Sequence, residues 1–276
     1  MLKQRVITAL VMLAILVPAI FYKTPLPFDL IVQLLIGAAA WEWGRLNDLE
    51  QRGSFALAAI CVMACGLSWY GGLLERPLFV LWVAAAAAWV LTGSWLLRNG
   101  VDGWQRIPKM LRLTGGLVAL WLVWLAVAQA RMIGISFLMS VLLLVWVADI
   151  FAYFAGRTFG GRFSKGKLAP SISPGKSWEG VWGGMAGGVA LALAWVFLGG
   201  ETLYSRLAER HGIAVMLLAV VFLAAMSVVG DLVESLVKRS AGVKDSSGLL
   251  PGHGGVLDRV DALLPTLPLA MMLATF

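Results

Sequence analysis

The sequence predicts an all-α, polytopic integral membrane protein with about nine transmembrane helices, and three observations support this prediction. The 276 residues are 60% hydrophobic and 13% charged, whereas soluble domains are about 45–50% apolar and about 25% charged. The mean hydropathy is +0.86. Apolar runs close to the roughly 20 residues that cross a bilayer recur along the whole chain. These features exclude a water-soluble globular protein, a disordered chain and a small disulfide-stapled protein.

Nine apolar runs approach bilayer length. The first follows a short basic start, and we interpret it as an uncleaved helix because no clear cleavage site follows it. The runs divide the chain into an N-terminal set of five helices (1–131) and a C-terminal set of four helices (132–276), which carries the candidate chemistry. The predicted spans are 6–22, 28–43, 55–74, 77–97, 113–130, 132–155, 177–198, 213–236 and 257–276.

The basic residues are distributed unevenly between the two sides that these spans define. If the N-terminus is cytoplasmic, 17 of the 22 Lys and Arg residues lie on the cytoplasmic side. This asymmetry is what the positive-inside rule predicts. We therefore attribute the net charge of +7 to membrane topology and expect no nucleic-acid partner. The five basic residues on the other side are Lys23, Arg76, Arg131, Arg206 and Arg210.

Acidic side chains are concentrated near the ends of the last two predicted spans. Asp231 and Glu234 lie late in the eighth span, and Asp258 and Asp261 open the ninth. Each pair has the i, i+3 spacing that places two side chains on one helix face. Charges at membrane depth are costly, and oxygen ligands with few histidines suit Mg²⁺. One pair alone could form ordinary ion pairs, but two facing pairs favour a metal site.

A glycine-rich basic loop, residues 235–261, separates the two acidic pairs. Its glycines let the backbone approach a ligand, and its basic side chains suit phosphate groups. Gly254 and Gly255 lead into the predicted ninth helix, whose N-terminal amides favour an anion. The residues alone therefore predict a site for phosphate and metal at the membrane face. The loop contains Gly248, Gly252, Gly254, Gly255, Lys238, Arg239, Lys244 and Arg259.

The same segment resembles the signature of the phosphatidate cytidylyltransferase (CDP-diacylglycerol synthase) family. That signature begins S-x-apolar-K-R, continues with K-D-x-small, and ends H-G-G-apolar-x-D-R-apolar-D. The stretch from Ser235 to Asp261 fits it at every specified position. The resemblance covers about a tenth of the chain and is highly specific.

The resemblance implies a reaction in which CTP and phosphatidic acid give CDP-diacylglycerol and pyrophosphate. It implies that Mg²⁺ is required and that Asp231, Asp258 and Asp261 gather it, with a monovalent cation such as K⁺ as a further candidate beside it. It also implies that Lys238, seven residues after Asp231, pairs with that aspartate. The expected setting is a bacterial inner membrane, with the N-terminus and site loops cytoplasmic, and the family suggests a homodimer.

A second segment, residues 171–180, resembles the looser S-P-x-K-[ST]-x-E-G stretch of the same family. Ser177 can cap the predicted seventh helix beside Lys176, and together they can face a phosphate; the alternative is a plain helix cap. A P-loop is rejected because Pro170 stands where its first glycine is needed. The predicted substrate-binding residues are Ser173, Lys176, Ser177, Arg239, Lys244, Asp245, His253, Gly254, Gly255 and Arg259, and the predicted catalytic residues are Asp231, Lys238, Asp258 and Asp261.

Two residues keep open roles. Asp149, inside the predicted sixth span, either helps to form a polar cavity or pairs with Arg157. His253 is a weak candidate for a general base because a phosphate monoester is already ionised at neutral pH and phosphoryl transfer depends mainly on alignment and charge. A hydrogen bond from His253 to a phosphate oxygen is the favoured interpretation.

Alternative functions also stay open. A related CTP-dependent membrane enzyme, such as an isoprenoid-lipid kinase or a CDP-archaeol synthase, would share much of the site. A CDP-alcohol phosphotransferase is disfavoured because the single Asp-Gly pair, Asp102–Gly103, lacks the residues that should follow it. An ion-coupled transporter would place its carboxylates near the midplane, whereas those of this chain cluster at one face.

Overall fold

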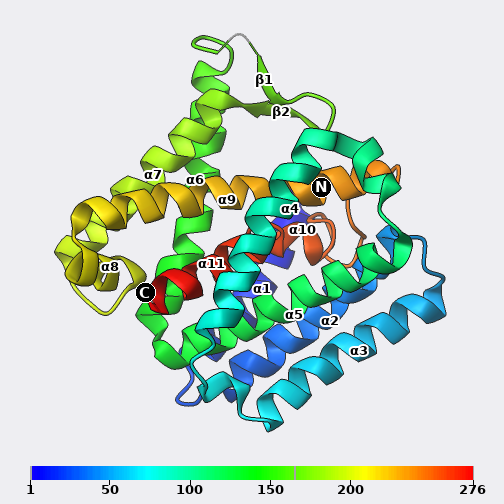
Figure 1. The fold of residues 1–276 in the computed structure, drawn as a ribbon, viewed down its shortest axis with the longest axis horizontal. Coiled ribbons are helices and arrows are strands. Elements are labelled where there is room, and N and C mark those ends of the chain that lie inside the picture. Colours follow the sequence, from blue (N-terminus) through cyan, green and yellow to red (C-terminus); the bar gives the residue numbers. More distant parts are fainter. Residues whose placement is uncertain (1, 165, 276) are drawn as a thin grey trace.

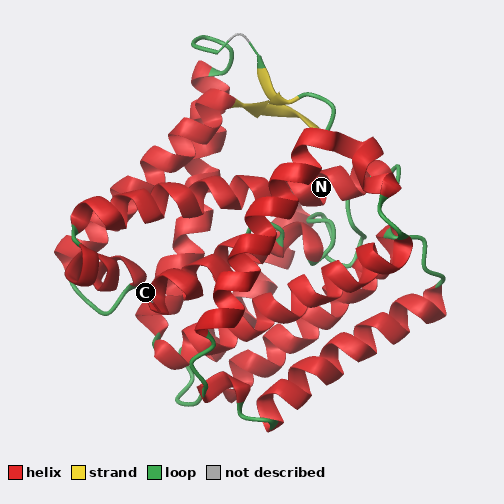
Figure 2. Ribbon diagram, in the orientation of Figure 1, coloured by secondary structure: helices red, strands yellow, loops and turns green. Residues whose placement is uncertain are grey.

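The computed structural model describes residues 2–164 and 166–275, and helices make up nearly all of it (Figures 1 and 2). Lys165 and Phe276, which the sequence-based predictions included, lie outside the described residues. The long helices are α1 (Leu2–Ile20), α2 (Leu26–Leu46), α3 (Gln51–Tyr70), α4 (Phe79–Arg106), α5 (Lys109–Ile133), α6 (Ile135–Phe159), α7 (Trp178–Leu198) and α9 (Ile213–Ser240). The short elements are η1 (Leu73–Glu75), β1 (Lys167–Ala169), β2 (Ser173–Ser177), α8 (Leu203–His211), α10 (Leu257–Val260) and α11 (Leu263–Thr275).

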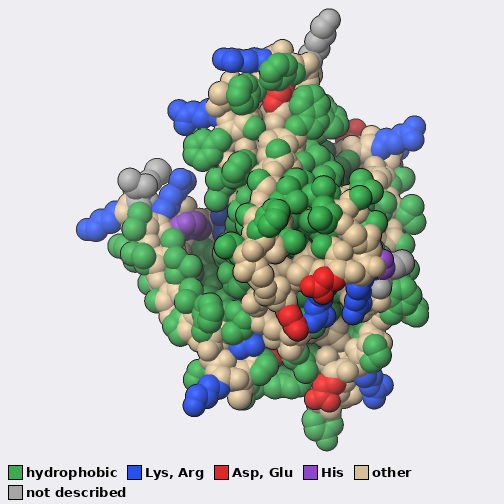
Figure 3. All heavy atoms as spheres, turned by 90° about the vertical axis from the view of Figure 1, so that its left-hand side faces the viewer, with side chains coloured by type: hydrophobic (Ala, Val, Ile, Leu, Met, Phe, Trp, Pro, Cys, Tyr) green, Lys and Arg blue, Asp and Glu red, His purple; other side chains and the backbone are tan. Residues whose placement is uncertain are grey.

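The eight long helices confirm the all-α polytopic membrane fold. Within the described residues, these eight are the helices long and apolar enough to cross a bilayer. Each overlaps one of the first eight predicted spans, with ends that differ by up to nine residues, the largest difference being at the end of α4. Hydrophobic side chains also cover much of the face drawn in Figure 3, as expected where lipid is the solvent. The predicted count of nine spans is not confirmed.

The predicted ninth span is divided into α10 and α11. The chain turns at Asp261 and Ala262, and α11 then holds Pro265 in its first turn and Pro268 further along. Its 13 residues rise about 20 Å, less than the roughly 30 Å of a hydrocarbon core. Most of its side chains are buried, and it packs against α4, α5, α6 and α9. This segment is therefore a central core helix (red in Figure 1).

Helices α6 and α7 form a tight pair because α7 presents a row of small residues. A Cβ atom added at Gly183 would lie 2.2 Å from the Cβ of Ala155, and one at Gly184 would lie 2.9 Å from the carbonyl oxygen of Ala148. Small residues let membrane helices approach closely and gain van der Waals contact. The antiparallel β1–β2 hairpin follows α6 and leads directly into α7, so it stands at one end of this pair (Figure 2).

Candidate active site

A polar cavity of about 370 Å³ lies where α6, the end of β2, the start of α7 and α9 meet. Asp149, Tyr153 and Arg157 of α6 line one side, and Asp231 of α9 lines another. Asp149 thus contributes to the cavity, whereas Arg157 donates a hydrogen bond to the hydroxyl of Tyr153, one helical turn away. The open question about Asp149 is resolved in favour of the cavity.

Lys176 and Asp231 form an ion pair inside this cavity. The Lys176 Nζ lies 2.5 Å from Oδ2 of Asp231, and the two side chains are 26% and 32% exposed. Asp231 Oδ1 also accepts a hydrogen bond from Ser235, one turn along α9. Because both charges remain accessible to solvent, a phosphate group and a cation could each replace one partner of the pair. Asp231 lies four residues before the signature loop, and Arg239 of that loop donates a hydrogen bond to the carbonyl of Ile172, so segments 171–180 and 235–261 are in contact beside the cavity.

Ser177 caps α7, as the sequence predicted. Its Oγ accepts a hydrogen bond of 3.2 Å from the backbone N–H of Gly180. The absence of side chains at Gly180 and Gly156 lets this turn approach α6, since an added Cβ at Gly180 would lie 3.0 Å from the carbonyl oxygen of Ala152. The cap and Lys176 therefore lie side by side on the cavity wall.

Glu179 fixes the segment between α6 and the hairpin. Its Oε1 accepts hydrogen bonds from the backbone N–H groups of Phe163 and Ser164 and from the hydroxyl of Ser164. The residue is 3% exposed. Glu179 belongs to the second family-like segment, but the sequence assigned it no role. Its contacts make it a residue that holds the cavity wall in place.

Lys238 does not pair with Asp231, so that prediction is wrong. Its Nζ lies 2.5 Å from Oε2 of Glu234 and 2.5 Å from Oδ1 of Asp258. Glu234 precedes Lys238 by one helical turn, a spacing at which side chains meet directly. Asp231 precedes Lys238 by seven residues, which is about 10 Å along the helix axis. Lys238 therefore bridges α9 to α10, and the ends of the last two predicted spans do converge.

Asp258 accepts hydrogen bonds from several groups. Oδ1 accepts from Lys238, and Oδ2 accepts from the backbone N–H groups of Ser246 and Gly255 and from the Ser246 hydroxyl. Burial alone would raise the pKa of Asp258, but these hydrogen bonds outweigh it and lower the pKa to about 2. Asp258 is therefore ionised at neutral pH and organises the signature loop around itself.

Glu42 of α2 is a site residue that the sequence analysis missed. It is fully buried, and its carboxylate accepts from the backbone N–H groups of Val256 and Leu257 at 2.9 and 2.7 Å. The hydroxyls of Ser246 and Ser247 also donate to it. The available signal was an acidic residue inside an apolar run, between Trp41 and Trp43.

The predicted anion site at the start of the ninth span is consequently wrong. The amides of Val256 and Leu257 bind the Glu42 carboxylate, and the amide of Gly255 binds Asp258. Gly255 is needed because an added Cβ would collide with Ser246 and Glu42. This glycine lets the loop pack against its own acidic residues.

Asp261 lies close to Asp231. A Cβ at Gly230 would lie 2.4 Å from the Asp261 carbonyl oxygen, so the turn after α10 rests on α9. Burial, followed by the negative charge of Asp231, raises the pKa of Asp261 to about 7. Such mutual repulsion between neighbouring carboxylates is relieved when a cation binds.

The carboxylates fit Mg²⁺ only in combination with other ligands. In the part of the chain that the structure describes, no three His, Cys, Asp or Glu side chains lie close enough together to form a metal site by themselves. Mg²⁺ often binds one or two protein carboxylates and completes its shell with water and substrate phosphates. Asp231 and Asp261 suit that mode, whereas Asp258 Oδ1 already accepts a hydrogen bond from Lys238.

The remaining predicted residues lie around this centre. Two N–H groups of Arg239 donate to the carbonyls of Ile172 and Val243, and Arg259 donates to the carbonyl of His253. Within the described residues, His253 Nδ1 is buried without a hydrogen-bond partner. Ser173 begins β2, Gly254 has a positive φ of 83°, and Lys244 and Asp245 are exposed. Their roles toward substrate stay predictions.

The fold and cavity define a polytopic membrane protein with a charged site, suited to phosphate and a divalent cation, at the ends of its helices. The model of the cytidylyltransferase family matches residues 3–276. The phosphatidate cytidylyltransferase of Pseudomonas aeruginosa is 40% identical over 97% of this chain and 95% of its own, and that of Haemophilus influenzae is 36% identical over 97% and 96%. The phosphatidate cytidylyltransferase of Bacillus subtilis is 41% identical over about half of each chain. The chain belongs to the cytidylyltransferase family.

Proposed function

We propose that this protein transfers the cytidylyl group of CTP to phosphatidic acid, giving CDP-diacylglycerol and pyrophosphate. The observation that carries the proposal is the Lys176–Asp231 pair, which joins the second family-like segment to the acidic residue that precedes the signature loop, in one polar cavity. The near-full-length similarity to two phosphatidate cytidylyltransferases supports the choice of substrates. This reaction needs a water-accessible charged site beside lipid, and the cavity supplies one.

In the proposed reaction, an ionised phosphate oxygen of phosphatidic acid attacks the α-phosphorus of CTP. A new phosphorus–oxygen bond forms, the bond to the β-phosphate oxygen breaks, and pyrophosphate carries away the electron pair. The nucleophile needs no proton removed, so the protein acts by alignment and charge neutralisation. Lys176 is placed to hold a phosphate, and the Ser177 cap fixes the turn beside it.

We further propose that Mg²⁺ is held by Asp231 and Asp261 together with substrate phosphate oxygens, with Asp258 Oδ1 as the third predicted ligand. When bound, the ion would offset the charge that develops on the leaving pyrophosphate. Lys238 keeps Asp258 ionised and in place beside α9. From the family resemblance we also propose that a monovalent cation such as K⁺ binds beside Mg²⁺ and that the protein forms a homodimer.

The proposed orientation places the N-terminus and the cavity in the cytoplasm of a bacterial inner membrane. The uneven distribution of basic residues supports it. That distribution does not depend on whether residues 257–276 cross the bilayer, because Arg259 is the last basic residue of the chain. CTP would then reach the cavity from the cytosol, and the lipid substrate would reach it from the adjoining leaflet.

Labelled CTP tests the proposed reaction. Purified protein in mixed micelles with phosphatidic acid should transfer label from [α-³²P]CTP to the lipid and none from [γ-³²P]CTP. Label transferred only from the γ-position, onto an isoprenoid alcohol, would identify a lipid kinase. Uptake of a solute into vesicles without CTP consumption would identify a transporter.

A further inference from the structure

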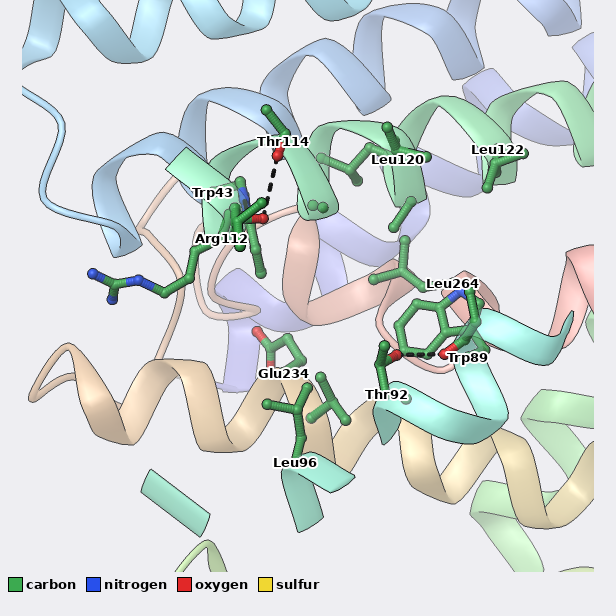
Figure 4. Close-up of a pocket in the computed structure, with 18 of the residues that line it drawn as sticks. Trp43, Trp89, Thr92, Leu96, Arg112, Thr114, Leu120, Leu122, Glu234 and Leu264 are labelled. Atoms are coloured by element: carbon green, nitrogen blue, oxygen red, sulfur yellow. Dashed lines mark hydrogen bonds between the residues drawn. The ribbon is translucent and has the colours of Figure 1, made fainter. Parts of the chain in front are cut away.

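A second cavity, of about 490 Å³, lies among α4, α5, α9 and α11 (Figure 4). It touches a different face of α9 from the polar cavity. Gly230, Val233 and Glu234 line the second cavity, whereas Val228 and Asp231 line the polar one. Most of the remaining lining side chains are apolar, so this space suits hydrocarbon and does not suit a nucleotide.

The cavity is bordered by side chains at the outer surface of two helices that can span the membrane. Trp95 of α4 is 46% exposed, and Leu111 and Val118 of α5 are 62% and 50% exposed. In a bilayer these exposed apolar side chains would contact lipid. The cavity can therefore receive a chain sideways from the membrane, between α4 and α5.

The length of the cavity also suits an acyl chain. Along α5 its lining extends from Leu111 to Leu122, a rise of roughly 16 Å. At the end nearer Leu111, Trp104 packs edge-on against Trp43, with ring centroids 5.6 Å apart. The indole N–H of Trp43 donates to the backbone carbonyl of Arg112. These contacts form a firm wall at the end where α5 begins.

The charge at that end favours an anionic head group. Arg112 lines the cavity and packs over the Trp104 ring at 5.8 Å. Within the described residues it forms no ion pair within 4.0 Å, and its Nε has no hydrogen-bond partner. Figure 4 shows its guanidinium pointing away from the apolar side chains. Arg106 ends α4 and Lys109 begins α5 nearby, so positive charge gathers at this end.

The same end of the cavity adjoins the signature loop. Glu234 lines the cavity and is 2% exposed, and its partner Lys238 also holds Asp258. Leu257, whose amide Glu42 binds, lines the cavity as well. A head group held near Arg112 would therefore lie close to the loop that organises the proposed active site.

We propose that this cavity binds one acyl chain of the phosphatidic acid substrate, with the lipid head group at the end of the cavity that adjoins the signature loop. The inference rests on the proposed function, and it specifies which part of the protein holds the lipid substrate. It predicts that filling the cavity weakens binding of phosphatidic acid and leaves binding of CTP unchanged.

A matched pair of substitutions tests this prediction. Ala88 lines the cavity, whereas Ala87, its neighbour on α4, does not, and both are exposed. Ala88→Phe should raise KM for dioleoyl phosphatidic acid about tenfold, the factor that about 1.4 kcal/mol represents, with KM for CTP unchanged. Ala87→Phe should leave both constants near the wild-type values. Equal effects of the two variants, or a change in KM for CTP alone, would overturn the proposal.

A binding measurement separates this inference from the proposed function. Wild-type protein would be photolabelled with phosphatidic acid that carries a diazirine in its acyl chain, and the labelled peptides identified by mass spectrometry. We expect label on cavity residues of α4 or α5, competition by unlabelled phosphatidic acid, and a loss of label in Gly115→Phe, where an added Cβ meets open space. Label elsewhere, or equal labelling by a phosphatidylcholine probe, would refute the cavity assignment even if CDP-diacylglycerol is formed. Labelling as expected in a protein that forms none would refute only the proposed reaction.

Discussion

The carboxylate of Glu42 in α2 accepts the backbone N–H of Leu257, 215 residues later in the chain, at 2.7 Å. The same carboxylate accepts the N–H of Val256 and the hydroxyls of Ser246 and Ser247. One buried acidic residue of the N-terminal helices therefore holds the signature loop of the C-terminal helices. This contact ties the geometry of the proposed site to a part of the chain that carries no family-like motif of its own.

Replacing Glu42 should damage both stability and activity. Glu42→Ala leaves the buried amides of Val256 and Leu257 without their acceptor, and each such loss costs about 1–3 kcal/mol. We expect a lower unfolding temperature in detergent and a reduced kcat, with Glu42→Gln intermediate because one acceptor oxygen remains. The exposed Glu50→Ala is the matched control. Wild-type stability and turnover in Glu42→Ala would show that the loop does not depend on this carboxylate.

Lys176 should be required for activity but contribute little to folding. Its ion pair with Asp231 is partly exposed, and such pairs stabilise proteins by at most about 1 kcal/mol. Lys176→Met should lower kcat/KM for CTP by about 100-fold or more with little change in unfolding temperature. Lys167→Met, at the exposed first position of strand β1, serves as the control. Comparable activity of the two variants would remove Lys176 from the proposed site.

Lys238 should behave in the opposite way and be needed for folding. Its partners Glu234 and Asp258 have side chains only 1% and 6% exposed, and a buried ion pair that loses one partner costs about 3–5 kcal/mol. Lys238→Met should therefore yield little monodisperse protein on size-exclusion chromatography. Adding Glu234→Gln and Asp258→Asn should restore folding without restoring activity. A well-folded single variant would contradict this structural role.

Activity should depend on a divalent cation through Asp231 and Asp261. Chelation with EDTA should abolish turnover, and Mg²⁺ should restore it. Asp261→Asn should raise the Mg²⁺ concentration needed for half-maximal rate, because one proposed oxygen ligand is lost. The exposed Asp102→Asn should have the wild-type Mg²⁺ dependence. Full turnover in EDTA would refute the proposal of a metal requirement.

The helices were largely predictable from sequence because each of eight apolar runs has bilayer length. The ninth run was predicted as one span because its hydropathy resembles that of a span, whereas Asp261, Pro265 and Pro268 divide and shorten its helix. Its apolar side chains face other helices, and a sequence pattern does not distinguish burial in protein from burial in lipid.

The sequence predicted the residues of the site better than it predicted which side chains pair with one another. The ends of the last two predicted spans do converge, because Lys238 of α9 pairs with Asp258 of α10, and Lys176 lies beside Asp231. The pairing of Lys238 was wrong because helical spacing left several acidic residues within its reach. Glu42 was missed because its role depends on a contact across the fold that no local spacing reveals.

The most direct test of the central claim is an experimental structure with Mg²⁺ and a CTP analogue that cannot be cleaved between its α- and β-phosphates. The account predicts triphosphate density in the polar cavity, with a phosphate at Lys176 and the metal between Asp231 and Asp261. Triphosphate density outside this cavity, with Lys176 still paired to Asp231, would contradict it.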